Sequence, residues 1–203
     1  MNQSHPFRTQ FTDHSSQFTD IIMQEKIQVL DKQFVKYITE DEIDAIEQQV
    51  ADQINEDYKD DDVLILVTLN GAMFFAVELL KKLHIKCRVS CIKLASYSGT
   101  TTTNKVQNLI GLNEDLQGQR VLIIEDIIDT GTTYQHLVEI LKDKGLRDMR
   151  IATLAYKPDS YSANLPIHYV GKSIPNKFVI GHGFDYNGYG RNLPDIYQLM
   201  NNE

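Results

Sequence analysis

The sequence has little of what marks several classes of protein. Among 203 residues it has 2 cysteines, 5 prolines and no tryptophan. None of its apolar runs reaches the roughly 18 residues that a membrane-spanning helix needs. Cys87 and Cys91 are too few for a disulfide scaffold, and their spacing on one face of an expected strand favours buried, reduced thiols. We therefore expect a cytoplasmic protein with no membrane partner.

Positive charge is also scarce. Lys and Arg number 20 against 28 Asp and Glu, which gives a formal net charge of −8. Nonspecific affinity for nucleic acid depends on Lys and Arg contacts with phosphates, so we expect no nucleic-acid partner. If the ligand is an anion, its site must supply a local positive potential through backbone amides, a metal ion or a few placed cations.

The length and the absence of internal repeats indicate one domain. At about 150 residues per domain, a chain of this length has room for roughly one. Residues 1–20 are polar and rich in Ser, Thr and Gln, and they lack the basic region and apolar block of a secretory signal. We expect residues 1–20 to form a loose arm and residues 21–203 to form the domain.

Strand and helix signals alternate along the domain. Thr39 and Glu42 are spaced as a capping box, which predicts the start of a helix. Short, continuous apolar runs predict strands that are covered on both faces. The expected strands lie at 63–67, 88–94, 121–124, 151–155 and 178–180, and further helices at 72–83 and from Gly131 to about 144. This alternation predicts an α/β fold in which helices flank a central parallel sheet.

One polar stretch, from Ser98 to Asn108, carries four consecutive threonines, a glycine and two asparagines. A connection of this length is either a functional lid or a plain disordered loop, and its composition leaves both interpretations open.

The most informative segment runs from Val121 to Thr133. An apolar strand ends in two adjacent acids, Glu125 and Asp126, and a turn follows at the start of a helix. Ligands of open α/β sheets bind at the carboxyl ends of the strands, and a helix start offers unpaired amides that suit a phosphate. The turn comprises Asp129, Thr130, Gly131, Thr132 and Thr133.

The adjacent acids point to a different partner. Two carboxylates beside a phosphate would repel it unless a cation or a set of hydroxyl groups lies between them. Carboxylate oxygens suit hard cations such as Mg²⁺, and they also accept hydrogen bonds from sugar hydroxyls. Glu125 and Asp126 are therefore candidates for contact with a sugar or a hydrated magnesium ion.

This segment resembles the phosphoribosyl-pyrophosphate binding motif of the type I phosphoribosyltransferases. Further segments resemble the hypoxanthine-guanine branch of that family, in the same order from about Val63 to Leu193. They are Leu69-Asn70-Gly71, Ala95-Ser96-Tyr97, Pro175-Asn176-Lys177-Phe178-Val179, and Asp185-Tyr186-Asn187 with Arg191. The resemblance implies the type I phosphoribosyltransferase fold, with a small hood built from the N-terminal region and from residues of about 168–203.

The resemblance also implies an activity, purine salvage, and its cofactor, Mg²⁺. The family joins a 6-oxo purine base to the ribose of phosphoribosyl pyrophosphate, releasing pyrophosphate and giving IMP from hypoxanthine or GMP from guanine. By similarity, Glu125 and Asp126 hold the ribose hydroxyls directly or through magnesium, and the turn from Asp129 to Thr133 encloses the 5′-phosphate. Asp129 is the candidate catalytic acid or base at the purine N7.

The remaining roles are divided between the base and pyrophosphate. The resemblance implies that Lys157 reaches the purine 6-oxo group, Phe178 stacks on the ring, and Asp185 binds a second magnesium ion. Further purine contacts are expected from Lys177, from the Val179 backbone and from Asp185. Pyrophosphate contacts are expected from Asn70, Gly71, Ser96, Tyr97 and Arg191. By the same resemblance, Ser96 and Tyr97 are the first residues of a mobile lid.

The sequence departs from the family's pattern at Asn70, where many relatives carry Lys, so that a cation is missing from the expected pyrophosphate site. Two alternatives stay open: an enzyme that prefers xanthine or guanine, and a regulator that senses phosphoribosyl pyrophosphate and binds nucleic acid. The family also leads us to expect a homodimer or homotetramer.

Overall fold

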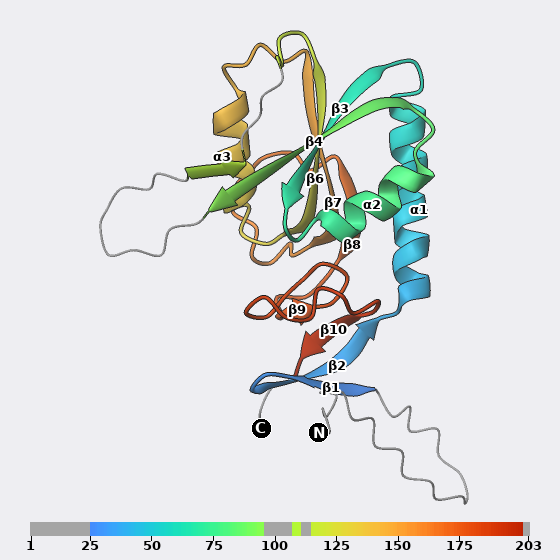
Figure 1. Cartoon of the computed structure of the whole chain (residues 1–203), viewed down its shortest axis with the longest axis vertical. Helices are drawn as coiled ribbons and strands as arrows, with labels where there is room; N and C mark the ends of the chain where they lie inside the picture. Colours follow the sequence, from blue (N-terminus) through green and yellow to red (C-terminus); the bar gives the residue numbers. More distant parts are fainter. Residues whose placement is uncertain (1–24, 96–106, 111–114, 201–203) are drawn as a thin grey trace, which may run out of the picture.

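The computed structural model describes residues 25–95, 107–110 and 115–200. Within these ranges the chain forms two β-sheets and three α-helices (Figure 1). The expected arm over 1–20, and Ser96 and Tyr97 with most of the polar stretch that follows, lie outside the described residues. None of the helices described is both long and apolar enough to cross a bilayer.

The larger sheet, which we call the central sheet, has the strand order β5-β4-β3-β6-β7-β8. Strands β4, β3, β6, β7 and β8 are parallel, which confirms the predicted central parallel sheet. Strand β5 pairs with β4 in the antiparallel direction and forms one edge. The strands are β3 (Asp62–Leu69), β4 (Lys86–Ala95), β5 (Gln107–Ile110), β6 (Arg120–Ile128), β7 (Asp148–Tyr156) and β8 (Tyr169–Ser173).

Helices cover both faces of the central sheet. Helices α1 (Glu40–Asp57) and α2 (Met73–Lys82) lie on one face, and α3 (Thr132–Leu141) lies on the other (Figure 1). Along β3 the side chains alternate between the two faces: Ile65 packs in the core under α1 and α2, whereas Leu64 and Leu66 pack in the core under α3. Because both faces are buried, the strand reads as a continuous apolar run.

The start of α1 confirms the predicted capping box. The Thr39 hydroxyl accepts a hydrogen bond from the Glu42 amide at 3.3 Å, and the Glu42 carboxylate accepts one from the Thr39 amide at 2.9 Å. Helix α3 ends at Leu141, three residues earlier than expected, and Gly145 then adopts a φ of +66° in the connection to β7. Helix α1 thus begins after Thr39 and α3 after Gly131, as the sequence predicts.

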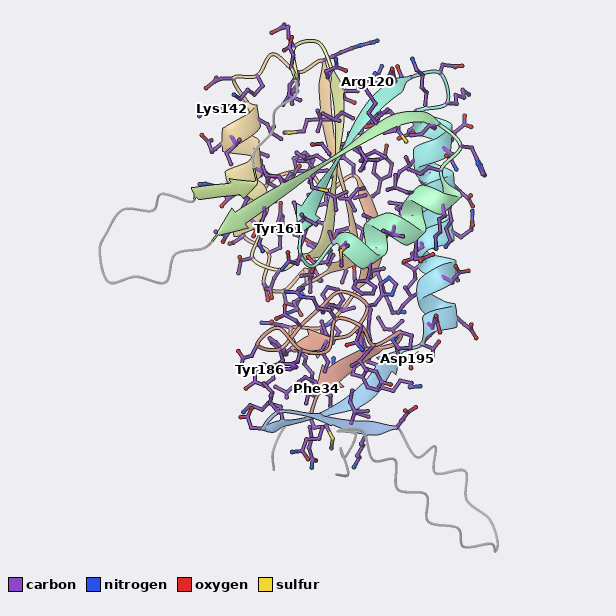
Figure 2. The ribbon with its side chains drawn as sticks, in the orientation of Figure 1. Phe34, Arg120, Lys142, Tyr161, Tyr186 and Asp195 are labelled. Atoms are coloured by element: carbon purple, nitrogen blue, oxygen red, sulfur yellow. The ribbon has the colours of Figure 1, made fainter. Side chains whose placement is uncertain are left out.

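The smaller sheet, which we call the small sheet, is antiparallel and has the order β1-β2-β10-β9. Its core contains Phe34, Ile180 and Tyr197, and Figure 2 shows Phe34 in this part of the molecule. The strands are β1 (Lys26–Val29), β2 (Lys32–Ile38), β9 (Val179–Ile180) and β10 (Ile196–Leu199). The first and last described strands, β1 and β10, thus belong to the same sheet.

The C-terminal part of the small sheet begins later than residue 168, the limit expected from the sequence. Strand β8 pairs in parallel with β7, so residues 169–173 belong to the central sheet. Gly171 makes this packing possible, because a Cβ atom there would lie 2.6 Å from both Ile46 and the Leu154 carbonyl oxygen. A short, glycine-containing strand of this kind carries little apolar pattern, and its partner is set by tertiary contacts.

Candidate active site

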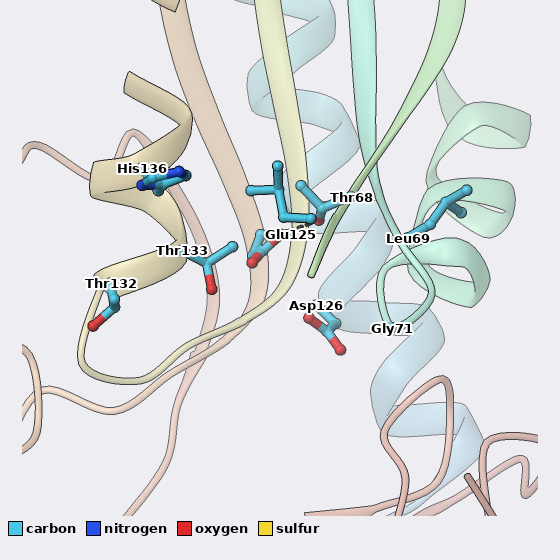
Figure 3. Close-up of a pocket in the computed structure, with 9 residues that line it drawn as sticks. Thr68, Leu69, Gly71, Glu125, Asp126, Thr132, Thr133 and His136 are labelled. Carbon is cyan, nitrogen blue, oxygen red and sulfur yellow. Dashed lines mark hydrogen bonds between the residues drawn. The ribbon is translucent and has the colours of Figure 1, made fainter. Parts of the chain in front are cut away.

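The site lies where the connections of the central sheet diverge. Neighbouring strands β3 and β6 lead into α2 and α3, which cover opposite faces, so a crevice opens between the ends of the two strands. A pocket of about 250 Å³ occupies this position (Figure 3). It is lined by Thr68, Leu69, Gly71, Leu94, Glu125, Asp126, Thr132, Thr133 and His136.

The two adjacent acids lie in the last residues of β6, which extends to Ile128, farther than predicted. Successive side chains of a strand point to opposite faces, and Figure 3 shows Glu125 beside Thr68 and Asp126 beside Gly71. The Thr68 hydroxyl contacts the Glu125 carboxylate and lies 2.8 Å from the Ile124 carbonyl oxygen. The Asp126 carboxylate accepts a hydrogen bond from the Ile127 amide at 2.9 Å. Each acid is therefore held on its own side of the strand.

Burial disfavours the charged form of both acids. Burial raises the pKa of Glu125 well above its usual value, and the neighbouring charge of Asp126 raises it further. Burial also raises the pKa of Asp126, although the Ile127 amide and the positive charge of Arg191 act in the opposite direction. A bound cation would favour both carboxylates and reverse these shifts.

Gly71 lies directly against this acid pair. The preceding Leu69–Asn70 peptide bond is cis, and a Cβ atom on Gly71 would lie 1.7 Å from the Asp126 Oδ2 atom. No side chain fits at this position without displacing the carboxylate. The Asn70–Gly71 loop therefore brings the Gly71 backbone to the edge of the pocket.

The turn after β6 presents the start of α3. Gly131 has a φ of +86°, and a Cβ atom there would lie 2.5 Å from Ala163 and 2.6 Å from Tyr161, so that only glycine fits. Because the N-cap is a glycine, it offers no side chain to the first amides of α3, and the Thr132 amide donates instead to the Thr130 hydroxyl at 3.4 Å. The hydroxyl groups of Thr130 and Thr132 lie 2.9 Å apart. A hollow of about 210 Å³ lies within this turn.

Asp129 and Lys157 form an ion pair. The Lys157 Nζ atom lies 2.7 Å from the Asp129 Oδ2 atom; Lys157 is buried, and the Asp129 side chain is 42 % exposed. Lys157 follows directly on β7, and its amide donates to the Ile128 carbonyl at 2.9 Å. The register of two neighbouring strands thus places the candidate acid–base group next to the candidate purine contact.

The small sheet contributes a loop that faces the acid pair. Arg191 pairs with Asp185 at 2.5 Å and also donates to the Gly183 carbonyl oxygen at 2.5 Å. The second oxygen of Asp185 accepts from the Gly188 amide at 2.7 Å. A Cβ atom on Gly183 would lie 2.2 Å from the Gly71 carbonyl oxygen, so this loop lies directly on the loop after β3.

The expected purine-stacking residue lies in an aromatic cluster. Phe178 is 43 % exposed; its ring centroid lies 6.4 Å from that of Phe34 and 5.9 Å, edge to face, from that of Tyr186. Val179 is buried in β9, and Lys177 is exposed. Among the described residues, no hydrogen bond or ring contact joins Phe178 to Asp129 or Lys157.

The sequence analysis missed three residues that line the pocket, namely Thr68, Leu94 and His136. Thr68 carries a signal, because it is the first polar side chain after the apolar run of β3. His136 also carries one, because it lies one helical turn beyond Thr132 on α3. Leu94 is indistinguishable in sequence from a core residue, whereas Leu69 belongs to the Leu69-Asn70-Gly71 segment named above.

Comparisons with known proteins agree with this geometry. The model of the phosphoribosyl transferase domain matches residues 38–187. The hypoxanthine-guanine phosphoribosyltransferase of Staphylococcus epidermidis is 39% identical over 144 residues, covering 70% of this chain and 80% of that protein. The hypoxanthine phosphoribosyltransferase of Escherichia coli is 39% identical over 146 residues, covering 70% and 82%.

Solved structures show the same likeness. A crystal structure of a hypoxanthine phosphoribosyltransferase from Staphylococcus aureus has a TM-score of 0.77 at 34% identity and covers 81% of this chain and 90% of that one. A hypoxanthine-guanine phosphoribosyltransferase from Bacillus anthracis has a TM-score of 0.76 at 30% identity, covering 81% and 98%. The chain therefore belongs to the phosphoribosyltransferase family.

Proposed function

We propose that the protein is a purine-salvage enzyme that transfers the 5-phosphoribosyl group of phosphoribosyl pyrophosphate to N9 of hypoxanthine, and of guanine. The products are IMP or GMP and pyrophosphate. One observation carries the proposal: the acid pair, the Gly131 turn and the Asp129–Lys157 pair meet at one end of the central sheet. The family and the relatives named above support it.

The central sheet holds the activated sugar. Glu125 and Asp126 accept hydrogen bonds from the ribose hydroxyls, and the 5′-phosphate occupies the hollow of the Gly131 turn. The amides at the start of α3, its positive dipole end and the hydroxyl groups of Thr130, Thr132 and Thr133 supply the donors. An overall acidic chain can in this way bind an anion.

The acid pair also fits a magnesium ion. Within the described ranges no group of three His, Cys, Asp or Glu side chains is placed to hold a metal. Mg²⁺, however, is commonly bound by one or two carboxylates together with substrate oxygens and water, and Glu125 and Asp126 supply those carboxylates. Asp185 is a candidate for a second ion. Bound magnesium would spread the charge of the leaving pyrophosphate.

The Asp129–Lys157 pair recognises the purine base and transfers its proton. The Lys157 ammonium has three donors; one engages Asp129 and the others are available to the purine 6-oxo group. A 6-amino purine offers no acceptor there and leaves the buried cation unpaired, which is the basis for rejecting adenine. Asp129, partly exposed beside the ammonium, accepts the proton from N7 as N9 bonds to the ribose C1′ and the bond from C1′ to pyrophosphate breaks.

The leaving pyrophosphate lies between the two sheets. Asn70 and Gly71 contribute donors from the central sheet, and Arg191 contributes a planar guanidinium from the small sheet. Phe178, held by Phe34, stacks on the purine, with further contacts from Lys177 and the Val179 backbone. Closure by Ser96 and Tyr97 stays a prediction, because both lie outside the described residues.

Turnover of a panel of bases tests the proposal. Hypoxanthine, guanine, xanthine and adenine are each supplied with phosphoribosyl pyrophosphate and Mg²⁺, and pyrophosphate release is measured. We expect hypoxanthine and guanine to have the highest kcat/KM and adenine no measurable turnover. Preference for xanthine would support the first alternative, and preference for adenine would contradict the role of Lys157. Binding of phosphoribosyl pyrophosphate without turnover of any base, together with a salt-dependent gel shift, would support the regulator.

We also infer that the enzyme is a cytoplasmic homodimer or homotetramer. Met73 and Val77, one turn apart on α2, are 45% and 47% exposed and offer an apolar surface for association. Light scattering on the purified chain measures the mass, and a monomer at micromolar concentration would contradict this inference.

A further inference from the structure

Glu47 occupies a position where the apolar stripe of α1 would be expected to continue. It is 1% exposed, and Ile43 and Val50, on the same face of the helix, are also buried. A buried carboxylate lowers stability unless it is paired and hydrogen-bonded. The partners of Glu47 therefore show what this carboxylate holds in place.

Each oxygen of Glu47 engages a different element. The Oε2 atom lies 3.2 Å from the Nζ atom of Lys82 at the end of α2, and Lys82 also pairs with Asp44 at 2.7 Å. The Oε1 atom lies 3.0 Å from the Nε2 atom of His182, which is 135 positions away and leads from β9 toward the Asp185 loop. Glu47 thus ties α2 and the small sheet to the middle of α1.

His182 is fixed through both its backbone and its ring. Its φ of +46° lies in the left-handed region, between Gly181 and Gly183 with φ values of +99° and +101°. Its amide donates to the Leu193 carbonyl at 2.7 Å, and its buried ring lies 6.1 Å from that of Phe74 on α2. The contact with Glu47 is therefore made by a residue with little freedom to move.

The effect of this contact reaches the site one residue later. Gly183 abuts the Gly71 carbonyl oxygen, its amide donates to the Arg191 carbonyl at 3.0 Å, and its carbonyl accepts from the Arg191 guanidinium. Arg191 in turn pairs with Asp185. A displacement of His182 would therefore move the loop after β3 and the Asp185–Arg191 pair together.

We infer that Glu47 and His182 are positioning residues that hold Asp185 and Arg191 over the pyrophosphate end of the substrate. The inference rests on the proposed function. The Glu47–His182 contact acts through Gly183 and Gly71, so it sets affinity for phosphoribosyl pyrophosphate and for pyrophosphate. Phe178 is supported separately by Phe34 and Tyr186, so affinity for the purine depends on it far less.

Three substitutions test the contact by steady-state kinetics. Glu47→Leu keeps a side chain of similar size but removes the polar contacts with Lys82 and His182. His182→Asn introduces a residue that tolerates a positive φ but is too short to reach Glu47. We expect each to raise the KM for phosphoribosyl pyrophosphate by about tenfold, with a smaller change in the KM for hypoxanthine. Glu47→Gln, which still accepts a hydrogen bond from His182, should stay close to the wild type. The double variant Glu47→Leu/His182→Asn should be no worse than either single variant.

Glu78→Gln is the matched control. Glu78 lines the same cavity of about 240 Å³ as Glu47 and His182, but it pairs with Lys81 at the surface of α2. Its KM values should equal those of the wild type. An unchanged KM for phosphoribosyl pyrophosphate in a folded Glu47→Leu variant would overturn the inference.

Hydrogen exchange separates this inference from the proposed function. The amides of His182 and Gly183, both hydrogen-bonded within the loop, should exchange faster in Glu47→Leu than in the wild type or in Glu78→Gln. A wild-type chain that makes no nucleotide would contradict the proposed function, and exchange would still decide whether Glu47 holds the loop. Unchanged exchange in such a chain would overturn the inference.

Discussion

The two sheets of the molecule are stabilised in different ways. The central sheet is buried on both faces by two large apolar clusters, whereas the small sheet has a core of three buried residues, Phe34, Ile180 and Tyr197. The small sheet is attached to the rest through Ile38, Val179 and Ile196, which pack in the larger of these clusters, and through polar contacts: the Glu40 amide donates to Asp195 at 2.8 Å, and Glu47 contacts His182. Figure 2 shows Asp195 close to the start of α1.

This difference suggests how the work of the site is divided. The proposed sugar and phosphate contacts, Glu125 and the Gly131 turn, lie on the sheet with the larger core. The proposed base-stacking and pyrophosphate contacts, Phe178 and Arg191, lie on the sheet with the smaller core. Because few buried apolar contacts lower the free energy of local opening, we expect the small sheet to open first. Substitutions in the two sheets should therefore have different kinetic effects.

The largest effect is expected at the end of the central sheet. Asp129→Asn keeps the shape and a hydrogen bond to Lys157 but cannot accept a proton, so kcat should fall by about 10²- to 10⁴-fold. Binding of phosphoribosyl pyrophosphate, measured by calorimetry, should be nearly unchanged. Asp159→Asn, at an exposed position on the following loop, is the control. An unchanged kcat would remove Asp129 from the mechanism.

A smaller effect is expected at the proposed pyrophosphate site, where the loop after β3 meets the loop that carries Gly183. Gly71→Ala places a Cβ atom on the Asp126 carboxylate, so the KM for phosphoribosyl pyrophosphate should rise by about tenfold. Lys81→Ala, at an exposed position of α2, controls for a general change in this region. If Gly71→Ala kept the wild-type KM, the carboxylate would not need its observed position.

A still smaller effect is expected inside the small sheet. Phe34→Leu removes a ring that packs against Phe178 and Tyr186, so the KM for hypoxanthine should rise by about three- to tenfold. The KM for phosphoribosyl pyrophosphate should change less. An equal rise in both would show that the two sheets do not act separately. Circular dichroism and thermal unfolding establish that the variant is folded.

The smallest effect concerns stability in the absence of metal and substrate. Burial raises the pKa of Glu125 and Asp126 in the folded chain above their unfolded-state values, so the folded state binds more protons. Their contribution to stability is therefore present at low pH and is lost as the pH rises through their folded-state pKa values. Relative to Glu125→Gln/Asp126→Asn, the wild type should lose free energy of unfolding between about pH 4 and neutrality.

Urea unfolding at each pH measures this difference. Addition of Mg²⁺ with phosphoribosyl pyrophosphate should stabilise the wild type and not the double variant, because bound ligand raises the apparent stability of the folded state. A difference that does not vary with pH would contradict the assigned direction of the pKa shifts.

What could be predicted from the sequence was local. The capping box of Thr39 and Glu42 spans four residues. The continuous apolar runs of β3 and β6 indicate by themselves that both faces of these strands are buried. The acids at the end of β6 and the Gly131 turn were found together because one short segment carries them. Their roles, and that of Lys157, remain predictions that depend on the resemblance to the family.

What could not be predicted depends on contacts between distant segments. The sequence around β8 contains no signal that residue 169 pairs with Ala152 of β7, and the Glu47–His182 contact spans 135 positions. Glu47 has a polar side chain on an apolar stripe, which sequence reasoning treats as an interruption. Pairing energy of this kind exists only in the folded chain, because it depends on burial that the fold creates.

The strand order of the small sheet has a consequence for folding during synthesis on the ribosome. Strand β10 lies between β2 and β9, so the last strand to be synthesised is an interior one, and β2 lacks this partner while about 160 residues are added. Removal of residues 196–199 would thus split the sheet into two parts instead of trimming its margin. Nascent chains halted before Ile196 should accordingly have a complete central sheet, with the proposed sugar contacts, and an incomplete small sheet beside the proposed purine contacts.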